Sequence, residues 1–507
     1  MADEEKPTGE KNTQSAAASE LSRYFVTVPK DKQTTVSDPV TKRLSWSGVG
    51  EHMEYEATVA HLDVVDDTGA LEGKMFSITY EKLDDSGNVM ADRPVTFCFN
   101  GGPGCASVPI NFGGMGPKRV ETHGVKHLSS AAKAVDNPHT LLKHTDLVFL
   151  DALGTGYSTL ADGADAEAIF GIDGDADAFC RAITQWLEEH HRWQSPVYLF
   201  GESYGTVRNA ALMRLMGERG VKLTGVTMLS AIWNWVQVQP GEDLYYLGML
   251  PTYAAAAQFF GKAGQNQDVD TWFDMAMDWT EDVLAPALLK GDRLEKDREL
   301  EIAQEMSEFI GLDEKFIARR HLRVSLDDVR RELLADEGRV CGRLDMRFSS
   351  DAPSYAQDSS EWFAGEDAAD DAVNAVWNTA FRTFLSNMGY KAPARYLDNN
   401  YYRVGVKWRW AHEEPGTGGA ATAPNVTVDI ACALRRDPTI KLAVLGGRYD
   451  AATTYWNNVF ELSRQFLSNE LKDRVVFHRY GCGHMAYVDE PTLERMDKDM
   501  EAFYQAE

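Results

Sequence analysis

The sequence predicts an α/β fold: a mostly parallel central sheet with helices on both faces, interrupted by a largely helical insertion. Short apolar runs bounded by Gly, Pro and Asp recur along the chain, as expected of buried parallel strands. Stretches with helical spacing of apolar residues lie between them, and this alternation favours a doubly wound sheet. The runs are VTFCF at 95–99, DLVFL at 146–150, VYLF at 197–200, VTMLSAI at 226–232, LAVLGG at 442–447 and VVFHRY at 475–480.

The first elements differ from this pattern. Residues 1–20 are polar and poor in large apolar groups, so we expect a flexible tail there. Residues 55–65 and 75–80 are rich in β-branched and aromatic side chains, and the turn signal DDSGNV follows at 84–89. Together they predict an antiparallel opening to the sheet. The first long helix is expected within 172–192, where Phe, Ile, Trp and Leu recur at helical spacing.

Between about 236 and 425 the alternation gives way to stretches rich in helix formers, such as SLDDVRRELLADE. Residues 348–381 hold seven acidic side chains and no Lys or Arg, which indicates a solvated loop in part of this region. PGTGGAATAP at 415–424 has the composition of a linker. The expected organisation is a tail at 1–20, an α/β core at 21–235, a largely helical cap insertion at 236–425, and the rest of the core at 426–507.

The charge of the chain bears on its partners. Its 507 residues include 78 Asp and Glu against 51 Lys and Arg, a formal net charge of −27. Such a surface repels nucleic acid and anionic lipid, so neither is expected as a partner. The N-terminus lacks the pattern of a secretory signal, and the chain lacks an apolar run of about 18 residues. Six scattered cysteines without C-x-x-C spacing indicate reduced thiols, so we expect a cytoplasmic protein without a metal site.

The strongest local motif is GESYG at 201–205, which lies between a predicted strand and a predicted helix. It matches the G-x-S-x-G nucleophile elbow of the α/β-hydrolase fold. The serine of an elbow occupies a strained turn, and small neighbours let the backbone approach itself. We therefore expect Ser203 to be a nucleophile and the backbone N–H of Tyr204 to face a developing oxyanion.

A nucleophilic serine needs a base and a group that orients this base, and in this fold they follow in the order Ser, Asp or Glu, His. Asp450 comes just after the strand at 442–447, and His484 lies in a glycine-rich loop after the strand at 475–480. Taken singly, Asp450 can be a helix cap and His484 a surface histidine. Their joint position behind an elbow favours a catalytic triad.

A second glycine-rich loop, NGGPGC at 100–105, follows the strand at 95–99. Its glycines let a backbone N–H reach the reaction centre, and Gly102 is the expected second donor to the oxyanion. The alternative is a tight Gly-Pro turn. A phosphate loop is excluded, because no Gly-Lys-Ser/Thr follows.

These motifs, with DALGTGYS at 151–158 and GHM at 483–485, resemble the serine carboxypeptidase family (peptidase family S10). The absence of a signal peptide and of a cysteine framework is more similar to bacterial members. The resemblance implies that Asn100, Gly101 and Glu202 bind the terminal carboxylate of the substrate. It also implies that Tyr157 and Met485 line side-chain pockets, although either could equally pack in the core.

The carboxylate site has a chemical requirement and one departure from the family. An ionised Glu202 would repel a carboxylate, so it must be protonated, and its pKa is expected to rise on burial. Eukaryotic members have a second glutamate after the NGGPG loop, where this sequence has Gly114. Lys118 or Arg119 could supply charge instead, or could belong to a solvated loop.

The resulting prediction is a serine-type carboxypeptidase that forms an acyl-enzyme on Ser203 and needs no cofactor. Its expected partners are peptides with a free C-terminal carboxylate, and a homodimer is possible because 12 tryptophans leave room for an apolar interface. Two alternatives stay open: an esterase or acyltransferase with the same triad, and a non-catalytic binding protein that keeps the fold.

Overall fold

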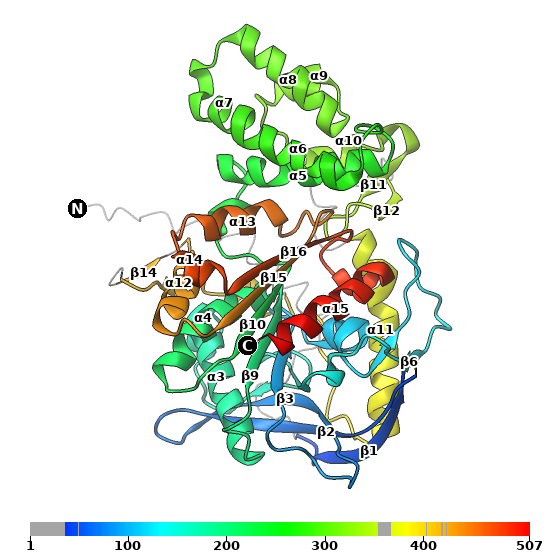
Figure 1. Ribbon diagram of the computed structural model, residues 1–507, viewed down its shortest axis with the longest axis vertical. Helices are drawn as coiled ribbons and strands as arrows, with labels where there is room; N and C mark the ends of the chain where they lie inside the picture. The colour runs from blue at the N-terminus through cyan, green and yellow to red at the C-terminus, as the bar shows by residue number, and fades with distance from the viewer. Residues whose placement is uncertain are drawn as a thin grey trace, which may run out of the picture.

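A central sheet forms the body of the protein (Figure 1). The computed structural model describes residues 36–48, 50–352, 367–401, 403–416, 419–421 and 423–506, so the predicted tail at 1–20 lies outside the described residues. Among these residues, ten strands join in the order β1-β2-β3-β7-β4-β9-β10-β15-β16, with β8 paired to β3. The strands are β1 (Val40–Ser47), β2 (His52–Val65), β3 (Leu71–Lys82), β4 (Val95–Phe99), β7 (Asp146–Leu150), β8 (Thr159–Leu160), β9 (Val197–Glu202), β10 (Gly225–Leu229), β15 (Lys441–Gly447) and β16 (Val475–Tyr480).

The sheet is parallel from β7 to β16, and its five inner strands β7, β4, β9, β10 and β15 are buried along their whole length. This burial is the physical reason for the uninterrupted apolar runs in the sequence. Each of the six predicted runs overlaps one of the strands, although VTMLSAI at 226–232 extends three residues beyond β10, so the prediction of a mostly parallel sheet is confirmed.

The antiparallel opening is also confirmed, because β1, β2, β3 and β7 pair antiparallel. The turn between β2 and β3 lies at 66–70, where the Asp66 carboxylate accepts the N–H groups of Thr68 and Ala70 at 2.8 and 2.9 Å. The DDSGNV signal instead forms a small turn closed by a bridge between Leu83 and Val89 at the end of β3.

Helices cover both faces of the sheet, as predicted (Figure 1). On one face Trp186, Val207 and Ile430 belong to an apolar cluster with strand residues, and on the other Phe381 and Met500 belong to a second one. The first face carries α3 (Ile172–Glu189), α4 (Tyr204–Glu218) and α12 (Thr427–Arg436), and the second α11 (Ala368–Met388) and α15 (Glu490–Gln505). Shorter helices are α2 (Ala166–Ile169), α13 (Tyr455–Ser463) and α14 (Asn469–Lys472).

A group of helices stands away from the sheet as a separate cap (Figure 1). They have a core of their own, which includes Leu250, Ile302 and Val329. Ion pairs from Arg448 and Arg479 of the body to Asp270 hold the cap against the sheet. The cap helices are α5 (Asp243–Phe259), α6 (Val269–Trp279), α7 (Ala285–Lys290), α8 (Lys296–Ile310), α9 (Glu314–Arg319) and α10 (Leu326–Glu332).

The acidic stretch 348–381 contains the start of α11, whose apolar side pairs with the sheet rather than with the cap. Residues 353–366 of that stretch lie outside the described part of the chain. The predicted linker at 415–424 holds β14 (Ala420–Ala421), which pairs with β13 (His412–Glu413). The boundaries at 236 and 425 stay a prediction. The remaining strands are β5 (Lys118–Val120), β6 (Ala134–Asp136), β11 (Arg339–Cys341) and β12 (Ser349–Asp351).

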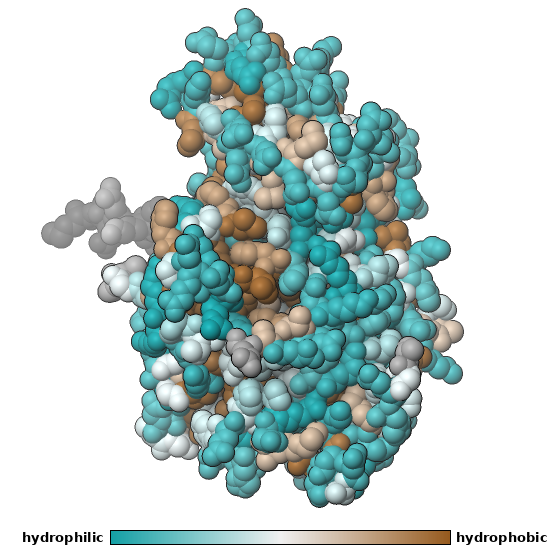
Figure 2. Space-filling view, viewed as in Figure 1, coloured by the Kyte–Doolittle hydropathy of each residue, from teal (hydrophilic) through white to brown (hydrophobic). Residues whose placement is uncertain are grey.

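The surface of this view is mostly hydrophilic, with apolar side chains gathered below the cap over β15 and β16 (Figure 2). β16 is the last strand in the order of the sheet, and its Val476 is 39% exposed. Within the described residues, no helix has both the length and the apolar character that a membrane crossing requires.

Candidate active site

Ser203 lies at the junction between β9 and α4, with φ 59° and ψ −128°. Few residues other than glycine adopt a positive φ, so this backbone is strained. Hydrogen bonds on both sides hold it: the Ser203 N–H donates to Leu229 at 3.0 Å, and the Thr206 N–H donates to the Ser203 carbonyl at 2.9 Å. The side chain is half-buried. The strained turn of a nucleophile elbow is therefore present at the predicted serine.

The two glycines of the GESYG motif are required by the close packing of this turn. A Cβ atom at Gly201 would lie closer than 3.0 Å to the Gly205 carbonyl oxygen. A Cβ atom at Gly205 would lie 2.9 Å from the carbonyl oxygen of Phe99 in β4. The elbow thus fits against the neighbouring strand only without side chains at these positions.

Asp450 and His484 follow the adjacent strands β15 and β16, and their side chains meet. Nδ1 of His484 lies 2.8 Å from Oδ2 of Asp450, and both groups are buried. Burial opposes the charged imidazole, but the carboxylate of Asp450 outweighs it and raises the pKa of His484. An imidazole oriented and stabilised in this way can accept a proton from a nucleophile.

Two further residues, Thr453 and Ser230, hold this pair and were not predicted from the sequence. The Thr453 hydroxyl lies 2.7 Å from Oδ2 of Asp450, and its backbone N–H donates to Oδ1 at 3.0 Å. The Ser230 hydroxyl donates to the His484 carbonyl at 2.6 Å. The position of Thr453, three residues after the aspartate, was the signal in the sequence.

The serine and the histidine are brought to the two sides of one strand end. The Ser203 N–H donates a hydrogen bond to the carbonyl of Leu229, the last residue of β10. The hydroxyl of the next residue, Ser230, donates one to the carbonyl of His484. Among the hydrogen bonds of the described residues, none joins the Ser203 hydroxyl to the imidazole. Catalytic hydrogen bonds are often long in substrate-free sites, so the complete triad stays a prediction.

The NGGPGC loop packs directly on the elbow. A Cβ atom at Gly101 would lie closer than 3.0 Å to the backbone nitrogen of Tyr204. Gly102 is exposed, with φ 109°. Within the described part of the chain, neither the N–H of Gly102 nor that of Tyr204 donates to a protein acceptor. Two donors without a partner beside a candidate nucleophile are what an oxyanion hole requires.

Glu202 is buried next to the nucleophile. Burial raises the pKa of its carboxyl to about 7, the direction that the sequence predicts. Oε2 accepts a hydrogen bond of 2.8 Å from the Tyr487 hydroxyl. Asn100 also lies beside this carboxyl, and its Oδ1 accepts the Ile110 N–H at 2.9 Å, which fixes the orientation of the amide.

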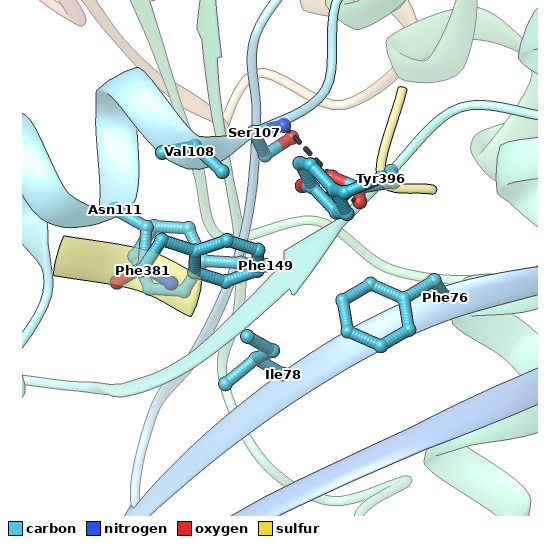
Figure 3. A pocket seen from close by; sticks show the side chains of 9 residues that line it. Phe76, Ile78, Ser107, Val108, Asn111, Phe149, Phe381 and Tyr396 are labelled. Carbon is cyan, nitrogen blue, oxygen red and sulfur yellow. Dashed lines mark hydrogen bonds between the residues drawn. The ribbon is translucent and has the colours of Figure 1, made fainter. Parts of the chain in front are cut away.

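A buried carboxylate, Asp151, is linked to Asn100 through hydrogen bonds of Ser107. Asp151 accepts the Ser107 N–H at 2.7 Å and the Tyr396 hydroxyl at 2.7 Å, and burial raises its pKa to about 6. The Ser107 hydroxyl in turn accepts the Asn100 N–H at 3.2 Å. Ser107 and Tyr396 line a small cavity with Phe76, Ile78 and other apolar side chains (Figure 3). Two of the residues that line it, Ser107 and Val108, follow the NGGPGC loop in the chain.

Two residues with predicted pocket roles are packed in the core. The Tyr157 ring lies 5.3 Å from Phe76 and 4.9 Å from Tyr396, measured between ring centroids. Met485 is 7% exposed and belongs to the same apolar cluster. These contacts are those of core packing, and a role in substrate binding stays a prediction for both residues.

The two cations considered for the carboxylate site have other partners. Arg119 is buried and forms an ion pair with Glu490, and Lys118 forms one with Asp136. Their charges are therefore balanced within the fold. In the described residues, no group of three or more His, Cys, Asp or Glu side chains is arranged to hold a metal ion.

Part of the chain is similar to known proteins. Residues 62–219 match the family model described as serine carboxypeptidase. The chain is 31% identical to serine carboxypeptidase-like 50 of Arabidopsis thaliana over 35% of its own length and 39% of the relative. It is 29% identical to serine carboxypeptidase-like 21 of the same plant over 26% of each. The matches thus span less than half the length of these relatives.

A solved structure extends the likeness to the whole architecture. The crystal structure of Kex1(delta)p, a prohormone-processing carboxypeptidase from Saccharomyces cerevisiae, matches with a TM-score of 0.56. The match covers 89% of this chain and 91% of the other at 14% sequence identity, so it bears on the fold alone. It confirms the predicted α/β-hydrolase fold.

Proposed function

Since the chain belongs to the serine carboxypeptidase family, we propose that it removes the C-terminal residue of peptides through an acyl-enzyme on Ser203. Its substrates are peptides with a free C-terminal carboxylate. The observation that carries the proposal is Glu202, a buried carboxyl with a pKa of about 7 that precedes the nucleophile. When it is protonated, this carboxyl can donate a hydrogen bond to a substrate carboxylate.

The chemical steps follow from the positions of the side chains. Ser203 attacks the last peptide carbonyl while His484 takes its proton and then delivers it to the leaving amine. Asp450, 2.8 Å from Nδ1, holds the imidazole in the required orientation. Water then attacks the acyl-enzyme, with the same histidine as base, and releases the shortened peptide.

The backbone N–H groups of Gly102 and Tyr204 stabilise the negative charge on the tetrahedral intermediate. Loss of one such donor typically costs about 3–4 kcal/mol of transition-state stabilisation. Neither group donates to an acceptor within the described residues, so both are available to the substrate.

Terminal-carboxylate recognition depends on the protonation of Glu202. A protonated carboxyl donates to the substrate carboxylate, whereas an ionised one repels it. The amide of Asn100 and the N–H of Gly101 complete the proposed set of donors. A pKa of about 7 lets Glu202 hold its proton up to neutral pH.

A matched pair of substrates tests the proposal. A peptide and its C-terminally amidated copy are incubated with the wild type and with Ser203→Ala, and the products are followed by mass spectrometry. We expect stepwise loss of C-terminal residues from the free acid, much slower loss from the amide, and neither in the variant. Equal rates for acid and amide would favour an esterase or acyltransferase. If neither substrate is turned over and a fluorophosphonate does not label Ser203, the result favours a binding protein.

Two further properties are proposals. A cytoplasmic location rests on the six scattered cysteines, all of which are free thiols in the structure. It is tested by cell fractionation. A homodimer is tested by sedimentation, which distinguishes it from the monomer by mass.

A further inference from the structure

The buried partner of Glu202 is a tyrosine that the sequence motifs do not include. Tyr487 lies in the 3-10 helix η8 (Ala486–Val488), three residues after His484. Its side chain is fully buried, and its hydroxyl donates to Oε2 of Glu202 at 2.8 Å. Asn100 lies beside the same hydroxyl. The proposed carboxylate site therefore has a phenol at its base.

Two glycines make room for this ring. Gly113 and Gly114 belong to the π-helix η1 (Pro109–Met115). A Cβ atom at Gly114 would lie closer than 3.0 Å to Cβ and Cγ of Tyr487, and one at Gly113 equally close to the edge of the ring. A side chain at position 114 and the tyrosine ring at 487 thus exclude each other.

We propose that Tyr487 is a positioning residue that orients Glu202 for the terminal carboxylate of the substrate. This inference rests on the proposed carboxypeptidase function. The hydroxyl keeps Oε2 of Glu202 as a hydrogen-bond acceptor. A proton taken up from water then resides on Oε1, which becomes the donor to the substrate.

The phenol contributes a donor without contributing a titration. Burial and the facing Glu202 raise the pKa of Tyr487 well above its ordinary value, so it remains neutral. A pair of carboxyls would share one proton and titrate in two steps, whereas the tyrosine leaves Glu202 as the group that titrates. The titratable groups around the pair are His484, Asp450, Cys105 and Asp370.

The consequence is a single loss of peptide affinity as the pH rises. Below about pH 7 Glu202 is protonated and donates to the substrate carboxylate. Above it the ionised carboxyl repels the substrate, and the KM for a free peptide rises. The KM for the amidated copy lacks this transition, because the amide carries no charge.

Tyr487→Phe tests the assignment. Loss of a hydrogen bond to the ionised carboxyl raises the pKa of Glu202, so the rise in peptide KM moves up by about one pH unit. Loss of the orientation lowers the ratio of kcat/KM for the peptide to that for its amide by about tenfold at acid pH. The measurement is the pH dependence of kcat and KM for both substrates.

The control is Tyr480→Phe. Tyr480 is a buried tyrosine whose hydroxyl donates to a carboxylate, Asp499, at 2.9 Å. The Tyr480→Phe variant loses the same kind of hydrogen bond away from Glu202. The ratio of kcat/KM for the peptide to that for its amide and the pH of the transition should therefore not change. Gly114→Ala is the second test variant, because its Cβ displaces the Tyr487 ring and should reproduce the effect of Tyr487→Phe.

The outcomes separate the inference from the proposed function. If the wild type cleaves peptide and amide equally, the carboxypeptidase assignment fails. If the wild type prefers the free peptide but both variants keep its ratio and its transition pH, Tyr487 has only a packing role and the inference is overturned.

Discussion

Glu202→Gln is the sharpest test of how the carboxylate site works. The pKa of Glu202 is about 7, so one pH unit above this value about a tenth of the enzyme is protonated. The KM of the wild type for a free peptide should therefore rise about tenfold between pH 6 and 8. Glutamine is a neutral donor at every pH, so in the variant the KM should remain flat across this range.

The same substitution has an effect on stability with a defined sign. The folded pKa of about 7 lies above the ordinary 4.5, so the fold holds a proton that the unfolded chain releases between these values. The stability from the neutral carboxyl is fully present below pH 4.5 and is lost as the pH rises through 7. The loss amounts to about 3 kcal/mol at most, and it should be absent in the variant.

The KM values are measured by steady-state kinetics with a peptide and its ester. The free energy of unfolding is measured by urea unfolding at both ends of the pH range. The ester is the control for the titration of the imidazole, which both substrates share. If wild type and Glu202→Gln show parallel KM profiles for the peptide, Glu202 does not bind the substrate carboxylate and the reasoning fails.

Three other substitutions test the rest of the site. Thr453→Val removes a hydroxyl 2.7 Å from Asp450; kcat should fall about tenfold with little change in KM, and an unchanged kcat would contradict a supporting role. Gly201→Ala forces a Cβ against the Gly205 carbonyl; the free energy of unfolding should fall by several kcal/mol (about 3 or more), and a stable variant would show that the elbow can relax. Asp345→Ala removes the acceptor of the Gly483 N–H, just before His484. The rates for peptide and amide should fall together by about tenfold or more, and a changed ratio of the two rates would argue against a role in positioning His484.

Much of the fold could be predicted from the sequence because the parallel strands are buried on both sides. A run such as VTFCF, which lies between a proline and a glycine-rich loop, is typical of a strand that is buried on both faces. The helix α11 was harder to predict, because its acidic composition hides an apolar side that includes Val373 and Phe381. The acidic composition of the segment indicates that it is exposed on average. It does not show that one side of the helix packs against a face of the sheet.

The site shows the same division. Ser203, Asp450 and His484 could be placed from motif order, since each follows a strand of one parallel sheet. The contact of Gly114 with Tyr487 could not, because nothing local in either segment points to the other. From the sequence, Gly114 shows only that a second glutamate is absent. The structure shows that the ring of Tyr487 occupies the space beside it.

The segment that carries His484 therefore serves two purposes in the proposed reaction. Its imidazole faces Asp450, and three residues later its phenol faces Glu202, the proposed recognition group. The segment between β11 and β12 holds it, because the His484 N–H donates to the carbonyl of Leu344 at 2.6 Å. Displacement of this one loop would remove base and recognition together.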